Sequence, residues 1–508
     1  MMHTARQDSP TGALVHHMLD GAVKDAPESP AVRDSAGRWS YRQLARHSVA
    51  FAAWLRRQGL RPGDRVLIQL PACREFAAMV FGVSRAGAVL VPLDPMTKAF
   101  QLRMIVADAE PAIVITAVPW ASILRSIASV LVHEVDHVWA EVEDLCSSDP
   151  EVEQYENCPS DPAVLIYTSG STGTPKAVVC PHRQIVFSCC ALTSVLGYRS
   201  ADVVFCRFPL SWDYGLYKLI MTCCARCEIV LAGGGTDLTL LSRMSETGTT
   251  VVPIVPSFAA MILRLAKREA GRLPRIRMFS NTGAALSPAM IQELSERFRG
   301  ARVVRQYGQT EAKRITVMPP DEHNERLGSV GRALPGTEVW ISDAAGNPLP
   351  AGRVGEIVVS GPHVMAGYWR NPEATRTVFR RDGRTGRVQL HTGDYGSLDE
   401  DGYLYFEGRR DEVFKRKGVR MSTTEIEQAA MDVAGVEAAA VVPPAEHHDL
   451  AIFAETALSA SRVLKELADR LEPAKVPASC HVVDELPRTP NGKHARDEMA
   501  MLLKRSNG

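Results

Sequence analysis

The chain has 508 residues, more than one hydrophobic core usually serves, so its length predicts one large domain and a smaller one. Hydrophobic residues make up 45% and charged residues 23%, an ordinary globular composition that excludes disordered and fibrous proteins. Lysine plus arginine balances aspartate plus glutamate at 58 each, so the overall charge does not support nucleic acid or an anionic membrane as partner.

The amino terminus and the cysteines indicate the compartment. The first residues, MMHTARQDSPTG, are polar, and no run reaches the about 18 apolar residues of a membrane span. The 11 cysteines are scattered among apolar neighbours, unlike a disulfide framework. We therefore expect a cytoplasmic protein in a reducing compartment. Cys223, Cys224 and Cys227 include a CxxC, but no second ligand pair accompanies it, so we interpret it as a buried helix end.

The first half of the chain alternates short apolar runs with helical stretches. Residues 63–71 (GDRVLIQLP) predict a buried strand, residues 74–88 a helix and residues 89–95 the next strand. The same order recurs over 249–283, and this βαβ pattern predicts parallel sheets.

The segment 163–178, AVLIYTSGSTGTPKAV, has the character of a phosphate-binding loop. Glycines let backbone amides approach phosphate oxygens, hydroxyls add donors and a lysine adds positive charge. The spacing is not that of a Walker A motif, because two residues separate Gly173 from Lys176 and Ala177 replaces the serine or threonine. A flexible linker is the rival reading, but linkers seldom follow a buried strand. The predicted phosphate-binding residues are Thr168, Ser169, Gly170, Ser171, Thr172, Gly173 and Lys176.

Further along the chain, Ser287 and Pro288 have the residue types of a helix N-cap and first helical position. After Gly328 the chain becomes turn-rich, and 343–352 and 399–408 predict hairpins of a β-rich subdomain. Beyond a charged stretch at 408–418, about ninety residues have helix and strand signals of their own. These are strongest at 423–434, 437–444, 459–472 and 477–487. We predict a large domain at 1–410 and a small α+β domain at 411–508.

Several motifs in a fixed order resemble the adenylate-forming superfamily of acyl-CoA synthetases, nonribosomal peptide synthetase adenylation domains and luciferases. They are WSYRQL (39–44), AGAVLVPLDP (86–95), the phosphate loop and PRTPNGK (487–493). The resemblance covers nearly the whole chain. It implies an α/β enzyme with a mobile small carboxyl-terminal domain, and ATP and Mg²⁺ as cofactors.

The resemblance assigns nucleotide-binding roles that the residues can perform chemically. Small side chains at 283–285 let a purine lie against the backbone, and a tyrosine can stack on it. A glutamate can hold magnesium, and an acceptor-only carboxylate suits the ribose hydroxyls. The residues assigned in this way are Gly283, Ala284, Ala285, Tyr307, Thr310 for phosphate, Glu311 for magnesium, Asp394 for ribose and Arg409 for ribose or phosphate.

Two residues of the carboxyl-terminal part complete the implied mechanism. Lys493 is expected to bridge the attacking carboxylate and the α-phosphate, although PNGK alone would be read as a surface turn. Asp411 matches the residue at which the family's small domain pivots between half-reactions.

The segment FPLSWDYGLYK is expected to line the acid pocket, with Trp212, Asp213 and Tyr214 as binding residues. By similarity to amino-acid-activating domains, Asp213 pairs with a substrate amine; the alternative is an internal ion pair with Arg314 or Lys218. Lys313 and Arg314 stand where many relatives have small or neutral residues. They indicate an acidic substrate or an ion pair with the pocket wall, and we also predict Arg314 as substrate-binding.

The expected activity is ATP-dependent conversion of a small carboxylic acid, an amino acid by preference, to its acyl-AMP. The acyl group then passes to a phosphopantetheine thiol, on coenzyme A or a carrier protein. Because the sequence ends fifteen residues after Lys493, we expect a free-standing ligase of secondary-metabolite type. The alternative acceptor is an amine or another non-thiol nucleophile. A luciferase-like oxygenase or a non-catalytic binding protein is disfavoured, the latter because the catalytic residues are all retained.

Overall fold

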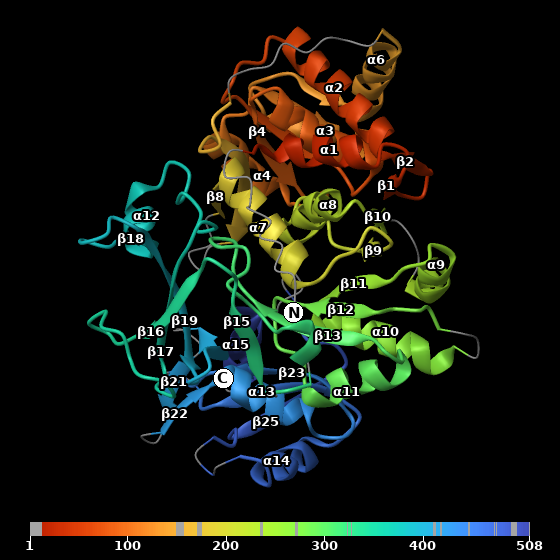
Figure 1. Cartoon of the computed structure of the whole chain (residues 1–508). Helices are drawn as coiled ribbons and strands as arrows, with labels where there is room; N and C mark the ends of the chain where they lie inside the picture. The colour runs from red at the N-terminus through yellow and green to blue at the C-terminus, as the bar shows by residue number, and fades with distance from the viewer. Residues whose placement is uncertain are drawn as a thin grey trace, which may run out of the picture.

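The computed structural model describes residues 13–148, 157–169, 175–233, 237–269, 273–322, 324–326, 328–409, 413–416, 419–445, 448–471, 473, 475–488 and 495–506. Within these residues the chain forms two large mixed sheets, each with helices packed against it, and a carboxyl-terminal group of smaller sheets and helices (Figure 1). The expected α/β class is confirmed. No helix in this described part of the chain is long and apolar enough to cross a membrane.

The first large sheet contains six strands in the order β6-β5-β3-β4-β7-β8. Its strands pair in parallel except β7 with β8, which form an antiparallel hairpin. The βαβ unit predicted at 63–95 is present as β3, α3 and β4, and most residues of these three elements are buried. The strands are β3 Arg65–Gln69, β4 Val89–Leu93, β5 Ile113–Thr116, β6 Val132–Glu134, β7 Pro162–Ser169 and β8 Pro175–Pro181. The helices of this region are α1 Val15–Asp25, α2 Tyr41–Arg57, α3 Arg74–Arg85, α4 Ala99–Ala109, α5 Val118–Ile127 and α6 Val135–Ser148.

The second large sheet has 14 strands, of which β13, β12, β11, β9, β10 and β1 pair in parallel, with β2 antiparallel at the edge beside β1. The βαβ unit predicted at 249–283 lies here, and the helix after it begins as expected, because the Ser287 side chain accepts a hydrogen bond from Met290 N with Pro288 at the first position. The strands of this part are β1 Pro30–Arg33, β2 Arg38–Ser40, β9 Val203–Cys206, β10 Glu228–Leu231, β11 Val251–Ile254, β12 Met278–Asn281 and β13 Arg302–Tyr307. The helices are α7 His182–Val195, α8 Asp213–Ala225, α9 Leu240–Glu246, α10 Pro256–Arg268 and α11 Pro288–Arg297, with a short 3₁₀ turn at Asp237–Thr239.

The antiparallel strands after β13 continue this sheet, because β14 pairs with the far edge of β13 and satisfies its backbone groups. Both predicted hairpins are present, as β16 with β17 and β19 with β20. The β-rich part is therefore joined to the parallel part by hydrogen bonds. Its elements are β14 Thr316–Val317, the 3₁₀ turn Pro320–Glu322, β15 Ser329–Ala333, β16 Glu338–Ser342, β17 Gly355–Ser360, α12 Pro372–Val378, β18 Phe379–Arg381, β19 Val388–Leu398 and β20 Tyr403–Arg409.

The carboxyl-terminal part has hydrophobic cores built from its own residues, such as Ile426, Val441 and Leu467. It contains a two-stranded and a three-stranded sheet, as an α+β unit should. The exact boundary at Asp411 lies outside the described residues and stays a prediction. The elements are β21 Val413–Arg416, β22 Val419–Ser422, α13 Thr423–Met431, β23 Val436–Val442, β24 Ala451–Thr456, α14 Ala460–Ala468, β25 Ser479–Val483 and α15 Arg496–Ser506.

Candidate active site

Tyr307, Asp394 and Arg409 meet where strands β13, β19 and β20 lie together. The Tyr307 hydroxyl donates to Asp394 Oδ2 at 2.7 Å. Arg409 faces Asp394 across the strand pair, and its Nε lies 3.3 Å from Asp394 Oδ1. Burial and the neighbouring carboxylate raise the pKa of Tyr307 well above its ordinary value, so the hydroxyl stays a donor. Residues 87 positions apart thus form one polar group.

Glu311 and Lys176 both lie near the side chain of Tyr368. The Tyr368 hydroxyl donates to Glu311 Oε1 at 2.7 Å, and Lys176 Nζ lies 5.9 Å from the centre of the same ring. Met365 N donates to the Glu311 backbone oxygen at 2.9 Å, which fixes the segment. In the described part of the chain Glu311 has only this neutral hydroxyl against its carboxylate and forms no ion pair, so its hard oxygen atoms fit a magnesium ion.

The turn at 283–285 follows the carboxyl end of β12 and is open to solvent. Gly283 has φ +83°, a conformation that favours glycine, and Asn281 Nδ2 donates to Ala284 O at 2.8 Å. Gly283, Ala284 and Ala285 therefore present backbone and small side chains on an exposed shelf at the strand end, as a flat ligand requires.

The base of the phosphate loop is the β7–β8 hairpin. Thr168 lies opposite Lys176, and its hydroxyl donates to Lys176 O at 3.3 Å. Ser169 ends strand β7, and half-buried Thr310 lies in the turn next to Glu311. The other predicted residues, Gly170, Ser171, Thr172, Gly173, Asp411 and Lys493, lie outside the described residues.

Residues 307–314 form a tight turn that joins the nucleotide side to the acid side. Ile315 N donates to Tyr307 O at 2.9 Å, and a Cβ on Gly308 would lie 2.4 Å from Lys313 O. Only glycine fits at this position. Lys313 has φ +54°, a left-handed conformation that costs about 1–2 kcal/mol for such a residue. The turn brings Tyr307, Glu311 and the two following cations to one place.

Asp213 is the first residue of helix α8, and Trp212 precedes it as the N-cap. Lys313 Nζ donates to Asp213 O at 2.6 Å and to Asp213 Oδ2 at 3.2 Å. An internal ion pair is therefore present, but its cation is Lys313 rather than Arg314 or Lys218. Burial acts to raise the pKa of Asp213, and Lys313 and Arg314 outweigh it and hold that pKa below its ordinary value.

Two more buried cationic side chains lie near the Asp213–Lys313 pair. Arg314 is buried with its guanidinium 5.0 Å from the centre of the Tyr214 ring, and Lys218 Nζ lies 5.4 Å from the same centre. Lys218 also donates to Tyr198 Oη at 3.1 Å. Burial, with Arg314 and Lys313 beside it, lowers the pKa of Lys218 to about 7. Burial likewise lowers the pKa of Lys313 to about 8.

Two tyrosines of this region were not singled out from the sequence, although Tyr217 belongs to the segment FPLSWDYGLYK expected to line the acid pocket. Tyr217 lies one helical turn after Asp213, and Lys313 Nζ sits 4.2 Å from its ring centre. Its buried hydroxyl has no hydrogen-bond partner among the described residues. The four-residue spacing from Asp213 places both on one helix face and could have identified Tyr217. Tyr368 had no local signal, because its partner Glu311 is 57 residues away.

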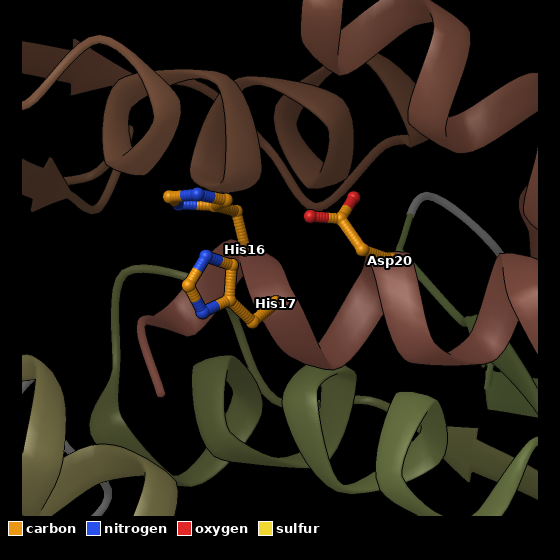
Figure 2. Close-up of side chains that lie close together, drawn as sticks. All are labelled: His16, His17 and Asp20. Carbon is orange, nitrogen blue, oxygen red and sulfur yellow. The ribbon is translucent and has the colours of Figure 1, made fainter. Parts of the chain in front are cut away.

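Another group of potential metal ligands lies away from this site, on helix α1. Figure 2 shows His16, His17 and Asp20 close together. Their donor atoms already have protein partners: His16 Nδ1 lies 2.9 Å from Ser84 Oγ, His17 Nδ1 accepts from Leu14 N, and Asp20 pairs with Arg85. The Arg85 cation also opposes a metal ion here, so we assign these residues to packing of α1. The cysteines of the CxxC are not part of any group of potential metal ligands among the described residues.

Comparisons with known proteins agree with this geometry. The family model described as AMP-binding enzyme matches residues 19–369, and the model of the AMP-binding enzyme C-terminal domain matches residues 425–493. A feruloyl-CoA synthase from an Amycolatopsis species is 30% identical over 93% of this chain and 96% of its own. Sulfoacetate–CoA ligase from Cupriavidus necator is 31% identical over 86% of this chain and 87% of its own.

Two solved structures are similar in sequence and fold. VinN is 48% identical with a TM-score of 0.75 and covers 78% of this chain and 99% of its own. It has also been solved with L-aspartate and with 3-methylaspartate. ATP-bound MatB from Rhodopseudomonas palustris is 28% identical with a TM-score of 0.86, over 98% of this chain and 100% of its own.

Proposed function

The chain belongs to the AMP-binding enzyme family, and we propose that within it the protein activates an acidic amino acid and passes the acyl group to a phosphopantetheine thiol. Membership makes it an ATP-dependent, AMP-forming acid ligase, as the sequence predicted. Its first half-reaction joins a carboxylate to AMP and releases pyrophosphate. What remains to be proposed is the acid, the acceptor and the metal.

The main support for an acidic substrate is the excess of buried cationic side chains at the start of helix α8. Lys313, Arg314 and Lys218 are buried there, against the single carboxylate of Asp213 within this group. Burying charge without a partner is costly, so a site of this composition favours an anionic ligand. The reacting carboxylate must face the α-phosphate. A second carboxylate on the substrate would neutralise the excess.

Asp213 supports an amino group on the same substrate. Its pKa is held low, so it is ionised at neutral pH and can accept from an ammonium group beside Lys313. The relative VinN has been solved with L-aspartate and 3-methylaspartate, molecules that carry one amine and two carboxylates. The charge pattern of this site suits the same chemical class.

On the nucleotide side, each group has a role that its position permits. Asp394, held by Tyr307 and Arg409, would accept from the ribose hydroxyls, and the shelf at 283–285 would contact the base. Lys176 and the loop hydroxyls, with Thr310, would hold the phosphates. Glu311 would hold magnesium, which when bound neutralises phosphate charge.

In the reaction, a carboxylate oxygen attacks the α-phosphorus and the bond to pyrophosphate breaks. Lys493 would stabilise the charge that develops between the two anions. A thiol then attacks the carbonyl carbon, AMP leaves and the thiol proton is released. Catalysis consists mainly of positioning and charge stabilisation. The acceptor would be coenzyme A or a carrier protein; an amine acceptor is the alternative.

The proposed acid is tested by ATP–pyrophosphate exchange with aspartate, 3-methylaspartate, glutamate, β-alanine, succinate, ferulate and anthranilate. We expect aspartate-like acids to give the strongest exchange and Lys493→Ala to abolish it. Lys313→Gln should raise the KM for the acidic amino acid by about 100-fold or more, because a buried charge pair loses one partner. Lys267→Gln, an exposed surface change, is the matched control.

A preference for succinate over aspartate would contradict the proposal that Asp213 binds the substrate amine. A preference for β-alanine or an aryl acid would contradict the proposal that the substrate is an acidic amino acid. The acceptor is decided separately, by following acyl transfer from the preformed adenylate to coenzyme A, to a phosphopantetheinylated carrier protein and to a panel of primary amines, each with and without enzyme. Enzyme-dependent transfer to an amine, with none to either thiol, would support the amine alternative.

A further inference from the structure

Three helices bring sulfur atoms together at the end of α8 away from Asp213. Cys190 Sγ of α7 lies 3.9 Å from Cys224 Sγ of α8, and Cys224 Sγ lies 3.7 Å from Met18 Sδ of α1. Figure 1 shows α7 and α8 next to each other beneath α1. Both cysteine residues are half-buried, whereas their neighbours Cys189 and Cys223 are buried.

We propose that Cys190 and Cys224 are a thiol modification site, which small disulfides such as oxidised glutathione convert reversibly into a disulfide joining α7 to α8. A disulfide requires sulfur atoms about 2.05 Å apart, so the two must approach by about 1.9 Å. Rotation of two short side chains supplies movement of this size. The site lies outside the ATP and acid sites, and its chemistry does not depend on which acid the enzyme activates.

The surroundings of the two thiols assign their roles in the exchange. The Cys190 and Cys224 thiols are within hydrogen-bond distance, and this contact, together with Arg226, lowers the pKa of Cys190. The same bond and burial raise the pKa of Cys224. Arg226 is held beside the pair, because its Nη1 donates to Cys224 O at 2.6 Å and its Nη2 pairs with Asp25 at 2.7 Å. Cys190 is therefore the attacking thiolate and Cys224 the resolving thiol.

The two steps balance. The Cys190 thiolate attacks one sulfur of oxidised glutathione, forming a mixed disulfide and releasing one glutathione thiolate. Cys224 then loses its proton and attacks the Cys190 sulfur, forming the protein disulfide and releasing the second glutathione. The two protein thiols are oxidised by two electrons, and one small disulfide is reduced to two thiols. A dithiol such as dithiothreitol reverses the reaction.

Neighbouring cysteines provide matched controls. Cys189 and Cys223 are adjacent in sequence to the proposed pair but are buried, and burial raises the pKa of each thiol. Cys158 is the exposed cysteine, and it reports whether the oxidant is active. The proposal therefore distinguishes between thiols one residue apart.

The test treats the full-length protein with oxidised glutathione and maps tryptic peptides by mass spectrometry without reduction. We expect peptide 184–199 linked to peptide 219–226, with both masses restored by dithiothreitol. The link should persist in Cys189→Ser and Cys223→Ser and disappear in Cys190→Ser and Cys224→Ser. Cys224→Ser should retain glutathione on Cys190, whereas Cys190→Ser should leave Cys224 unmodified.

Two results would overturn the proposal. One is full glutathionylation of Cys158 in a sample that contains no linked peptide. The other is a link that survives in Cys190→Ser or is lost in Cys189→Ser. The four variants change single thiols in one region and are compared with each other. A folding defect common to this region would remove the linked peptide from all four variants. That result would count against the proposal.

Discussion

Asp394 and Tyr307 show how side chains distant in sequence determine the environment of a carboxylate. Asp394 in HTGDYG would ordinarily be assigned to a turn, yet it is buried on strand β19 with the Tyr307 hydroxyl on one oxygen and Arg409 near the other. A buried carboxylate that faces two donors is held in one orientation. It is therefore prepared to accept from further hydroxyl groups at the same place.

Replacing Tyr307 by phenylalanine removes one of these donors. We expect the KM for ATP to rise about 10-fold, since a hydrogen bond to a charged group contributes about 1.5–3 kcal/mol. The KM for the acid should change little. Tyr405→Phe is the matched control, because Tyr405 also donates to a carboxylate, Asp399, on the same sheet. Equal effects of the two variants on ATP would contradict the role of Tyr307. The measurement is pyrophosphate exchange at varied ATP.

The buried lysines predict a pH dependence. Lys218 has a pKa lowered to about 7 and Lys313 one lowered to about 8, so the positive charge of the acid site falls as pH rises through this range. The KM for an acidic amino acid should therefore be lowest below pH 7 and increase between about pH 7 and 8. An amino acid with a single carboxylate should show a flatter profile. A rise of equal size for both substrates would contradict this assignment.

Lys218→Met tests the same group through stability. The folded pKa of Lys218 lies below the unfolded value of about 10.4, so below pH 7 the folded state bears a buried charge that costs free energy. That cost is relieved as pH rises from about 7 to 10. The variant should therefore be stabilised, by about 1–4 kcal/mol, most below pH 7 and least near pH 10. Melting temperatures across pH measure this difference, and a constant difference would exclude the lysine as its source.

Helix α8 is the element on which the acid site depends. It begins at Asp213, carries Tyr214 and Tyr217 toward Lys313, and ends near Cys224. Its first turn packs so closely that a Cβ on Gly215 would lie 2.1 Å from Pro209 O. The position of the first turn, and with it that of Asp213, is fixed by backbone contact.

Gly215→Ala should therefore lower the melting temperature and raise the KM for the acid, because backbone atoms must shift at a cost of about 1–3 kcal/mol or more. Gly21→Ala is the matched control, also a helical glycine, whose added Cβ would meet only the flexible end of Arg226 at 3.3 Å. That control should be neutral or stabilising by about 0.5–1 kcal/mol. Similar melting temperatures of the two variants would contradict the packing argument.

At the scale of the whole molecule, the parallel and antiparallel strands share one sheet, which joins the shelf after β12, the turn after β13 and the β19–β20 pair. The carboxyl-terminal part has separate hydrophobic cores. Two units with separate cores can change orientation without disrupting either one. Separate cores are what the pivot predicted at Asp411 requires; the pivot itself stays a prediction.

Asp411→Pro is expected to affect the two half-reactions unequally, because proline fixes φ near −65° at the predicted pivot. Asp411→Ala, which leaves the backbone free, should affect them equally or not at all. Pyrophosphate exchange measures the first half-reaction, and single-turnover transfer from the preformed adenylate to a thiol measures the second. If Asp411→Pro slowed both half-reactions by the same factor, the result would contradict a pivot at this position.

The sequence by itself determined the family, the α/β class and the βαβ units, because these depend on local periodicity and on motifs in a fixed order. The Ser287 cap was predictable for the same reason. The nucleotide-binding roles of Tyr307, Asp394 and Arg409 stay predictions, and the structure shows that these three side chains lie together. Lys493, the loop glycines and the boundary at Asp411 remain predictions from the sequence.

Only the tertiary structure decided which side chains meet. Asp213 pairs with Lys313, 100 residues away, as one of the two interpretations of Lys313 and Arg314 allowed, and not with Arg314 or Lys218, the partners named in the alternative for Asp213. Tyr368 reaches Glu311 across 57 residues, and Cys190 meets Cys224 across 34. Local pattern specifies which helix or strand forms and which face it buries. The partner of a side chain depends on how distant elements pack, and here the tight turn at 307–314 directs Lys313 rather than Arg314 to Asp213.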